Sequence, residues 1–434
     1  MKIAVIGLWH LGEVYSICLA KLGNKVIGID LNKEYVEDIS NGKLPLFEPD
    51  LFKLLEESKK NNKISFTTDL AIIASCSFVW VTIDTSVDKK DNAKLGIIFE
   101  NIERALPFIK NNTTIVISSQ IGLGASQRII DFIKKKRPKL KFEYAYVPEN
   151  LRIGESVKGF FKPTKIVIGT NSKKTFTKIR RIFRGLKTEF LYMSPSSAEM
   201  VKEATNSYLA TSLAFIFDIA DLCEKVGANI IDVVEALRLD HRIGKNAYLG
   251  VSVGFSGATL GRALRYLMKK STELGIKLPV INAVWRKNFK RKRIITEKLL
   301  PLVKSFSKKR VAFYGLTYKG GVTTLRNSRA LEIIKEIYNK GANIAIYDKN
   351  IKEIDLKKNL IKVPFEYFDN PYDAAAGCHC LVFITPSKNL LRLNFNKLKS
   401  KTRNPEVFFD TQNFFYDKKK LISNVGFKYL GLGI

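Results

Sequence analysis

The sequence is poor in the residues that build metal sites and disulfide frameworks. Its 434 residues include only three histidines and five cysteines, which is an odd number. The cysteines are scattered, as Cys18, Cys76, Cys223, Cys378 and Cys380. Scattered, unpaired thiols are typical of a reducing compartment, so we expect a cytoplasmic protein. Cys378-His379-Cys380 has no second cluster to complete a zinc site, and we therefore expect no metal.

Long hydrophobic runs are also absent. No stretch of about 18 uninterrupted apolar residues occurs, so no membrane span is expected. The apolar run Met1–Ile6 ends at a glycine and is too short for the core of a secretory signal, so none is expected. Hydrophobic residues still make up 46% of the chain and aromatic residues 11%, which is enough for packed cores. At this length we expect two or three domains.

Acidic residues are few relative to basic ones. There are 41 aspartates and glutamates against 73 lysines and arginines, a formal net charge of +32. This charge suits anionic partners such as dinucleotides, nucleotide sugars, nucleic acids or acidic membranes, but it also fits drift in an AT-rich genome. The densest basic run, Arg286–Arg293, is interpreted as an exposed helical face. Because no nucleic-acid-binding signature accompanies the charge, nucleic-acid binding is not expected.

Both ends of the chain alternate between strand and helix patterns. In the first part, short apolar runs typical of strands lie at 2–6, 25–29, 78–83, 114–118, 144–147 and 165–168. In the last part, strands are expected at 310–314, 343–347, 381–385 and 407–410, with a helix at 328–339. Such alternation predicts parallel, doubly wound sheets.

The middle of the chain has helical periodicity instead. Residues 198–226 alone are long enough for a central helix, with Ser196 and Ser197 as N-cap candidates and Pro195 ending what precedes. A helix of this length could carry a dimer interface. We therefore predict an α/β protein with two Rossmann-like doubly wound domains, joined by a long central helix and a helical middle domain. The expected domains are residues 1–194, 195–300 and 301–434.

The most specific local motif follows the first predicted strand. Gly7-Leu8-Trp9-His10-Leu11-Gly12 has the spacing G-x-G-x-x-G, except that Trp9 replaces the middle glycine. Asp30 ends the next strand, where an acid binds a ribose hydroxyl and favours NAD over NADP. The middle glycine normally lets a pyrophosphate approach the backbone. Trp9 therefore leaves open the alternative of a Rossmann fold that binds no dinucleotide.

Further motifs occur in order along almost the whole chain. After the glycine motif they are Asn41–Pro49 (NGKLPLFEP), Val147–Arg152 (VPENLR), Glu199–Asn206 (EMVKEATN), Asp240–Gly244 (DHRIG), Gly315–Lys319 (GLTYK) and Leu325–Ser328 (LRNS). Together they resemble the UDP-glucose/GDP-mannose dehydrogenase family. The resemblance implies NAD as cofactor and a nucleotide sugar as substrate. That family oxidises a sugar primary alcohol to a carboxylate with two NAD, through an aldehyde held on a cysteine.

The sequence departs from the family where that chemistry would occur. The segment that resembles the family's G-x-G-G-x-C-x-P-K-D is Gly254–Ala263, with Thr259 at the cysteine position and Ala263 at the aspartate position. Gln120 stands at the position of the family's catalytic threonine, and Ile153 at that of a second glutamate. A threonine hydroxyl is a weak nucleophile without an adjacent base.

Lys202 and Asn206 remain, one helical turn apart and so on one face of a helix. The pair resembles that of the β-hydroxyacid dehydrogenases, in which a lysine acts as base on a hydroxyl. What remains therefore suits a two-electron oxidation of an alcohol. The alternatives are a solvated helix lysine for Lys202 and a capping carboxylate for Glu149.

These matches give the candidate site residues. The catalytic candidates are Lys202, Asn206, Glu149 and, at the cysteine position, Thr259. The NAD-binding candidates are Gly7, Trp9, His10, Leu11, Gly12, Asp30, Lys33, Thr85 and Gln120. The substrate-binding candidates are Glu149, Leu151, Arg152, Lys202, Asn206, Arg242, Gly254, Phe255, Lys319 and Arg326. For the last two, which suit a diphosphate, the alternative is plain surface charge.

Three functions remain open. The favoured one is an NAD-dependent oxidoreductase that acts on a CH–OH group of a nucleotide sugar, similar to a UDP-glucose 6-dehydrogenase but with a single oxidation. The second is a non-catalytic nucleotide-sugar-binding or regulatory homologue, because Trp9, Gln120, Thr259 and Ala263 all depart from the family pattern. The third is a basic scaffold for nucleic acid or membranes. A homodimer without a membrane partner is expected.

Overall fold

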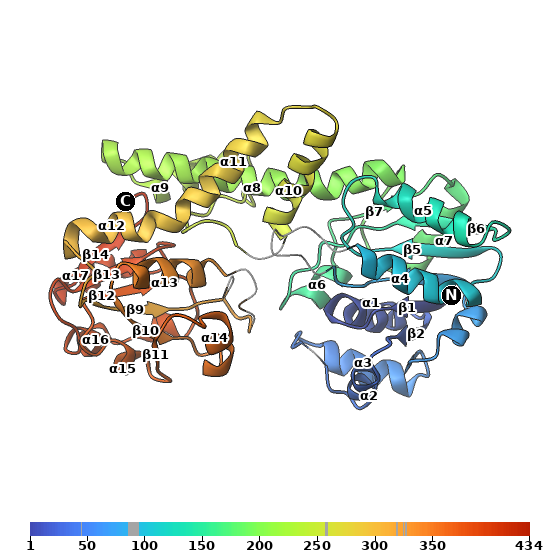
Figure 1. Cartoon of the computed structure of the whole chain (residues 1–434), viewed down its shortest axis with the longest axis horizontal. Coiled ribbons are helices and arrows are strands. Elements are labelled where there is room, and N and C mark those ends of the chain that lie inside the picture. Colours follow the sequence, from blue (N-terminus) through green and yellow to red (C-terminus); the bar gives the residue numbers. More distant parts are fainter. Residues whose placement is uncertain (45, 86–94, 257–258, 318–319, 324, 326–327) are drawn as a thin grey trace. The chain divides into compact units, whose positions relative to one another are not determined.

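The computed structural model describes the chain except for residues 45, 86–94, 257–258, 318–319, 324 and 326–327. It forms two compact units (Figure 1). The first unit holds residues 1–205 and 265–270, and the second holds residues 206–264 and 271–434. The boundaries expected for three domains remain a prediction.

The first unit is built on an eight-stranded sheet. Its strands are β1 (Lys2–Ile6), β2 (Lys25–Ile29), β3 (Ile64–Thr67), β4 (Phe78–Val81), β5 (Thr113–Ile117), β6 (Phe142–Tyr146), β7 (Lys165–Gly169) and β8 (Glu189–Met193). They lie in the order β3-β2-β1-β4-β5-β6-β7-β8, all parallel to their neighbours except that β7 is antiparallel to β6. The central strands β4 and β5 are buried along their whole length, as expected where helices cover both faces.

Helices cover the two faces of this sheet. They are α1 (His10–Lys21), α2 (Lys33–Ser40), α3 (Leu51–Lys60), α4 (Gly96–Ala105), α5 (Ala125–Lys136), α6 (Ser156–Phe161) and α7 (Lys173–Ile182), with 3-10 turns η1 (Leu70–Ser75) and η2 (Leu106–Phe108). Val14 of α1, Phe160 of α6 and Ile179 of α7 belong to one buried core, and Ile102 of α4 and Ile129 of α5 belong to another. Alternate residues of β1 enter the two cores, which therefore lie on opposite faces.

The second unit contains a six-stranded, fully parallel sheet. Its strands are β9 (Arg310–Tyr314), β10 (Asn343–Tyr347), β11 (Glu366–Tyr367), β12 (Cys380–Phe383), β13 (Val407–Asp410) and β14 (Lys428–Gly431), in the order β11-β10-β9-β12-β13-β14. Around it lie α12 (Ile294–Val303), α13 (Arg329–Asn339), α14 (Glu353–Asn359), α15 (Pro371–Ala374), α16 (Phe395–Lys399), α17 (Lys419–Asn424), η4 (Leu390–Arg392) and η5 (Tyr416–Lys418). The order matches that of the first six strands of the other sheet. The predicted fold class is confirmed.

The middle of the chain is helical, as predicted. It contains α8 (Pro195–Val226), α9 (Ile230–Leu239), α10 (Thr259–Glu273), α11 (Pro279–Lys290) and the 3-10 turn η3 (Arg291–Arg293). The expected start of α8 was wrong: the helix begins at Pro195, and the Ser194 hydroxyl accepts the Ser197 N–H at 3.1 Å. Proline suits a first helical position because its φ is already helical and it needs no amide partner there. No helix in the described part of the chain is long and apolar enough to span a membrane.

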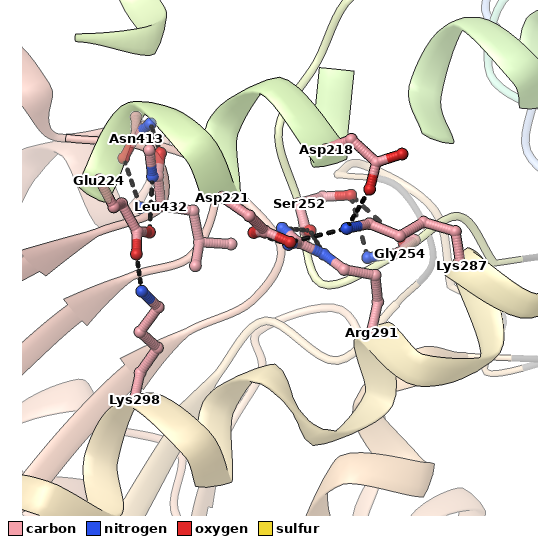
Figure 2. Close-up of polar contacts among 11 residues, drawn as sticks. Asp218, Asp221, Glu224, Ser252, Gly254, Lys287, Arg291, Lys298, Asn413 and Leu432 are labelled. Carbon is pink, nitrogen blue, oxygen red and sulfur yellow. Dashed lines mark hydrogen bonds and ion pairs between the residues drawn. The ribbon is translucent and has the colours of Figure 1, made fainter. Parts of the chain in front are cut away.

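In the second unit, an ion network joins α8 to α11 and η3 (Figure 2). Lys287 pairs with Asp218 at 2.5 Å and with Asp221 at 2.7 Å, and Arg291 pairs with Asp221 at 2.5 Å. The Arg291 guanidinium also lies 4.7 Å from the ring centre of Phe217. Arg291 is only 3% exposed, so the run 286–293 is not the uniformly exposed face that the sequence suggested.

Helix α8 also contacts the residues that follow β14 (Figure 2). Glu224 forms an ion pair with Lys298 of α12 and accepts the Gly433 N–H at 2.9 Å. The Ile230 N–H in turn donates to the Gly433 carbonyl at 2.9 Å. These bonds, with the core that Ile434 joins, attach the tail after β14 to α8 and α9.

Candidate functional site

The glycine motif follows β1 at the carboxyl edge of the first sheet. Gly7 follows β1 with φ +93°, in the region that favours glycine, and its N–H donates to the Ile29 carbonyl at 2.9 Å. Gly12 lies in α1, where a Cβ atom would stand 1.6 Å from the Gly7 carbonyl oxygen. Both glycines therefore allow a close approach of strand and helix that other residues would prevent.

The first turn of α1 is open to an anion. Its N-cap residue is Trp9, whose side chain caps none of the helix amides. Uncapped amides at a helix N-terminus, together with the helix dipole, suit a pyrophosphate. Trp9 has φ −65°, so it causes no backbone strain, and its indole alone distinguishes this loop from one with a middle glycine. Leu11 in the same turn is partly buried against the core of this face.

Asp30 supports the glycine loop from the end of β2. One carboxylate oxygen accepts the Leu8 N–H at 2.8 Å, and the other accepts the Asn32 N–H at 3.0 Å. Each oxygen keeps a further lone pair, and the side chain is only partly buried, so it can still accept a ribose hydroxyl. Lys33 lies just beyond, exposed, 3.6 Å from Glu37.

His10 is not exposed to a ligand in the way the motif suggested. Its side chain is buried, and Nε2 lies 2.7 Å from Glu48 Oε1 and 3.2 Å from the Ser156 hydroxyl. Glu48 also accepts the N–H groups of Gly154 at 2.7 Å and of Ser156 at 3.0 Å. Burial raises the pKa of Glu48, but the hydrogen bonds from His10, Gly154 and Ser156 outweigh burial and lower that pKa below its ordinary value. The cluster thus ties the cofactor loop to the segment after Arg152.

Glu13 is a second buried acid beside this cluster. It is fully buried in α1, and neither carboxylate oxygen has a hydrogen-bond partner in the described part of the chain. Burial, with the charge of Glu48, raises the pKa of Glu13 to about 9. The group is therefore a neutral acid near pH 7. Sequence analysis missed this residue, because a single glutamate in a helix carries no sign of its burial.

The loops after β4 and β5 come together. The Thr85 hydroxyl donates to the Gln120 carbonyl at 3.1 Å. From α8, the Glu199 carboxylate accepts the N–H groups of Gly124 and Ser126, each at 2.6 Å, at the start of α5. Glu199 thereby fixes the loop that contains Gln120, a role that sequence reasoning missed because its partners lie far away in the chain.

Lys202 of α8 reaches the segment after β6. It is 4% exposed, and its Nζ contacts the Glu149 carbonyl oxygen, Glu149 Oε1 at 3.4 Å and Asn150 Oδ1 at 3.4 Å. Three oxygen acceptors match the three N–H groups of an ammonium ion. Glu149 Oε2 accepts the Leu151 N–H at 2.8 Å, which fixes this turn. Arg152 follows with an exposed side chain.

Asn206 lies one turn further along α8, at the start of the second unit. It is 5% exposed, and its Nδ2 has no hydrogen-bond partner among the described residues. A buried amide without a partner is costly, and such groups are concentrated where a ligand completes the bonding.

The second unit also contains the site candidates Thr259, Arg242, Gly254 and Phe255. Thr259 is exposed at the first position of α10, and within the described chain its hydroxyl has no hydrogen-bonded base. Arg242 is exposed and pairs with Asp240 at 2.6 Å. Gly254 has φ +110°, and the Phe255 N–H donates to Asn288 Oδ1 at 2.8 Å. The two remaining substrate-binding candidates, Lys319 and Arg326, lie outside the described residues.

The fold and the glycine loop define a dinucleotide-binding dehydrogenase with two Rossmann-type sheets and a helical centre. Family models extend this description along the chain. Residues 1–187 match the NAD-binding domain of the UDP-glucose/GDP-mannose dehydrogenase family, residues 196–290 its central domain, and residues 312–417 its UDP-binding domain. The chain belongs to the UDP-glucose/GDP-mannose dehydrogenase family.

Individual relatives agree with this assignment. The chain is 29% identical over 436 residues to a UDP-glucose 6-dehydrogenase of Rickettsia conorii, with 100% of this chain and 99% of the relative covered. It is 28% identical over 416 residues to one of Bacillus subtilis, with 95% and 89% covered. A UDP-glucose dehydrogenase structure from Pyrobaculum islandicum superimposes with a TM-score of 0.87 at 23% identity, covering 95% of this chain and 94% of that one, which supports the fold.

The expected enzyme class is confirmed: the protein is an NAD-dependent nucleotide-sugar dehydrogenase. The residues present fit NAD. The uncapped start of α1 suits the pyrophosphate, Gly7 and Gly12 give backbone clearance, and Asp30 offers a carboxylate for a ribose hydroxyl. When bound, NAD supplies the acceptor for a hydride.

Proposed function

We propose that the protein oxidises one hydroxyl of a UDP-sugar in a single two-electron step. The proposal rests on a contrast between two groups of candidate catalytic residues. Lys202 and Asn206 are buried on α8, whereas the position of the family cysteine holds Thr259, exposed and without a hydrogen-bonded base in the described chain. A second oxidation requires a covalent adduct of the aldehyde, and such a hydroxyl is a poor nucleophile for it. The names of the relatives and the UDP-binding family model support the UDP-sugar class.

In the proposed mechanism, the reacting hydroxyl of the sugar replaces one of the two oxygens that lie 3.4 Å from Lys202 Nζ and accepts that N–H. The remaining N–H groups stay bonded to the Glu149–Asn150 segment, and an ammonium ion held in this place stabilises the alkoxide that develops as the hydride leaves. The sequence-based hypothesis made Lys202 the base. We instead assign the hydroxyl proton to the Glu149 carboxylate, 3.4 Å from Nζ, and a carbonyl forms as hydride and proton depart. The Asn206 amide donates its unpaired N–H to a sugar oxygen.

The test is the amount of NADH released per nucleotide sugar consumed, with a panel of UDP-, GDP- and dTDP-sugars. One NADH per UDP-sugar is expected. Two would mean that another nucleophile replaces the missing cysteine, and the mechanism would be wrong. No NADH with intact sugar binding would instead favour a non-catalytic homologue. Lys202→Met should lower kcat about 1,000-fold, whereas Lys174→Met, an exposed lysine of α7, should leave it unchanged.

We also propose that the protein is a homodimer through α8. Tyr208, Phe215 and Leu222 recur every seven residues on this helix and are 72%, 51% and 57% exposed, and Val226 is 67% exposed. A stripe of this spacing packs against an identical stripe on a second copy. Phe215→Glu should give a monomer by light scattering after gel filtration. Leu421→Glu, at an apolar residue that is 53% exposed on α17, should not.

A cytoplasmic location is part of the same proposal. All five cysteines are free and buried. Free thiols persist in a reducing compartment. Alkylation of intact cells followed by mass spectrometry of the unfolded protein should find all five reduced, and a stable disulfide would contradict the proposal.

A further inference from the structure

A cavity is lined on one side by the Glu149–Arg152 segment, two residues of which contact Lys202. Its volume is about 330 Å³, and all of its lining residues belong to the first unit. The lining runs from the Glu149–Arg152 segment through α6 to the start of β7, with Tyr15 of α1 and Phe183 after α7. Lys202 is not part of it. The Glu149–Arg152 segment thus contacts Lys202 and also forms one wall of the cavity.

The floor of the cavity is apolar. Tyr15, Phe160 and Phe183 belong to the buried core between α1, α6 and α7, and Ile166 adds an aliphatic side chain. Aromatic residues of this kind offer flat surfaces on which a ring or a short chain can lie. A cavity of about 330 Å³ falls at the lower end of the range for small-molecule sites, about 300 to 1,000 Å³.

The rim of the cavity is cationic. Arg152, Lys158, Lys162 and Lys165 line it, and none of the four has an ion-pair partner among the residues that the structure describes. The carboxylates of Glu149 and Glu155 also line the cavity. That of Glu149 is already engaged by the Leu151 N–H and Lys202. Positive charge therefore exceeds negative charge around an apolar floor.

We propose that this cavity binds a small aromatic anion, with its ring on Tyr15 and Phe160 and its acidic group among Arg152, Lys158 and Lys162. Arg152 lies three residues after Glu149 in the same short segment, and the Glu149 peptide carbonyl oxygen contacts Lys202 Nζ. An anion that draws Arg152 toward the cavity also displaces that peptide, and turnover falls at saturating sugar. Only this effect on turnover rests on the proposed function. Binding of the anion does not.

The first experiment measures binding directly. The probe is 8-anilinonaphthalene-1-sulfonate, an aromatic sulfonate whose fluorescence rises in apolar surroundings, titrated into the full chain with saturating NAD to occupy the dinucleotide site. One strong site per chain is expected. Binding that is weak and unsaturable, or that NAD abolishes, would overturn the proposal.

Two kinds of variant locate the site. Gly159 lines the cavity, and a Cβ there would meet only Leu151 Cδ2, at 3.7 Å, so Gly159→Leu should fill the cavity without a backbone clash. Lys158→Gln with Lys162→Gln removes two charges from the rim without entering the core. Each change should lower the affinity for the probe at least about tenfold. Lys187→Gln, a change at an exposed lysine outside the cavity, should leave that affinity unchanged. Equal affinity in all variants, each with an unchanged melting temperature, would overturn the assignment.

Kinetics then test the link to turnover. The probe should lower kcat for the best nucleotide sugar and leave its KM nearly unchanged, and Gly159→Leu should be resistant. If the nucleotide sugar instead displaces the probe in competition, the cavity is part of the substrate site and the regulatory proposal is wrong. If no nucleotide sugar is oxidised at all, the proposed function fails, while the fluorescence titration still decides whether the anion site exists.

Discussion

The loops that follow the first strand of each sheet begin alike. Gly7 and Gly315 both have positive φ, +93° and +74°. The next amide in each case donates to an aspartate at the end of the neighbouring strand: Leu8 to Asp30 at 2.8 Å, and Leu316 to Asp348 at 2.7 Å. Two domains with the same strand order therefore use the same device to turn the chain at the carboxyl edge of the sheet.

The helices that follow differ at their N-termini. α1 begins at His10, close after Gly7, and no side chain caps it. α13 begins only at Arg329, and its N-cap Ser328 accepts the Ala330 N–H at 3.2 Å. One helix therefore has no side-chain cap at its N-terminus, whereas a serine side chain occupies one amide of the other. We therefore expect the second loop to recognise charge through side chains. The sequence predicted Lys319 and Arg326 for this role.

Alanine at either glycine should have the largest effects. At Gly12 a Cβ would lie 1.6 Å from the Gly7 carbonyl oxygen, and at Gly315 one would lie 2.2 Å from the Thr385 carbonyl oxygen. Backbone overlap cannot be relieved by a rotamer, and a strain of about 3 kcal/mol corresponds to about 100-fold in affinity. Calorimetry should show that Gly12→Ala loses NAD but keeps UDP, and that Gly315→Ala does the reverse.

Gly250→Ala is the control, because a Cβ there meets no atom within 4 Å and the backbone is not left-handed. It should bind both ligands normally. If Gly12→Ala and Gly315→Ala each lose both ligands while circular dichroism stays native, the two loops do not serve separate ligands and the comparison fails.

The two aspartates should differ in what they contribute. Asp348 is 4% exposed and also accepts the Asn350 N–H at 2.9 Å, so Asp348→Ala leaves two amides unpaired in a buried place. We expect a loss of about 2 to 3 kcal/mol in the free energy of unfolding. Asp30 is partly exposed, so water can replace it. Asp30→Ala should cost about 1 kcal/mol of stability and weaken NAD instead.

Urea denaturation of both variants, followed by NAD titration, measures the difference. Equal losses of stability with unchanged NAD affinity would show that Asp30 only supports its loop and does not bind the ribose.

The central strands and the local motifs were predictable from sequence. Strands 2–6, 25–29, 310–314 and 343–347 were predicted with the bounds that the structure has, because each is a short, buried apolar run with a clear end. The strands β3, β8, β11 and β14 were missed. They are short or half-exposed, and β8 has no fully buried residue, so no continuous apolar run marks them.

The site was predictable only where it is local in sequence. Gly7, Gly12 and Lys202 stand in contiguous motifs whose spacing carries the information. The links from Glu48 to Ser156 and from Glu199 to Gly124 join distant segments, and a single glutamate gives no sign of its partner. Such contacts depend on the packing of the whole sheet and cannot be derived from spacing.

Glu13 in α1, just after the first loop, is a buried acid without a hydrogen-bond partner among the described residues, so the stability of the first unit should depend on pH. The folded pKa of Glu13, about 9, lies above the value of 4.5 for an unperturbed glutamate. Between these values the folded chain holds a proton that the unfolded chain releases, so the free energy of unfolding falls as pH rises. Glu13→Gln should remove this slope and stabilise the protein by about 1 to 3 kcal/mol at pH 8.

Thermal and urea unfolding between pH 6 and pH 8.5, without ligands, measures this effect. Glu353→Gln, an exposed acid of α14 in the other unit, is the control and should leave the slope as it is. A slope that survives in Glu13→Gln would place its origin elsewhere than this carboxyl.

The smallest effect should come from restoring the middle glycine. Trp9→Gly removes the indole from the open end of α1 without changing a backbone that has φ −65°. Glycine is also acceptable at an N-cap, so stability should change by less than about 1 kcal/mol. If the indole restricts the approach of the pyrophosphate, NAD should bind about five- to tenfold more tightly, a gain of about 1 kcal/mol. Thr317→Gly, at the corresponding place after Gly315, should leave NAD unchanged. Weaker NAD binding by Trp9→Gly would mean that the indole contacts the cofactor, and the open end of α1 would then be a surface that Trp9 completes.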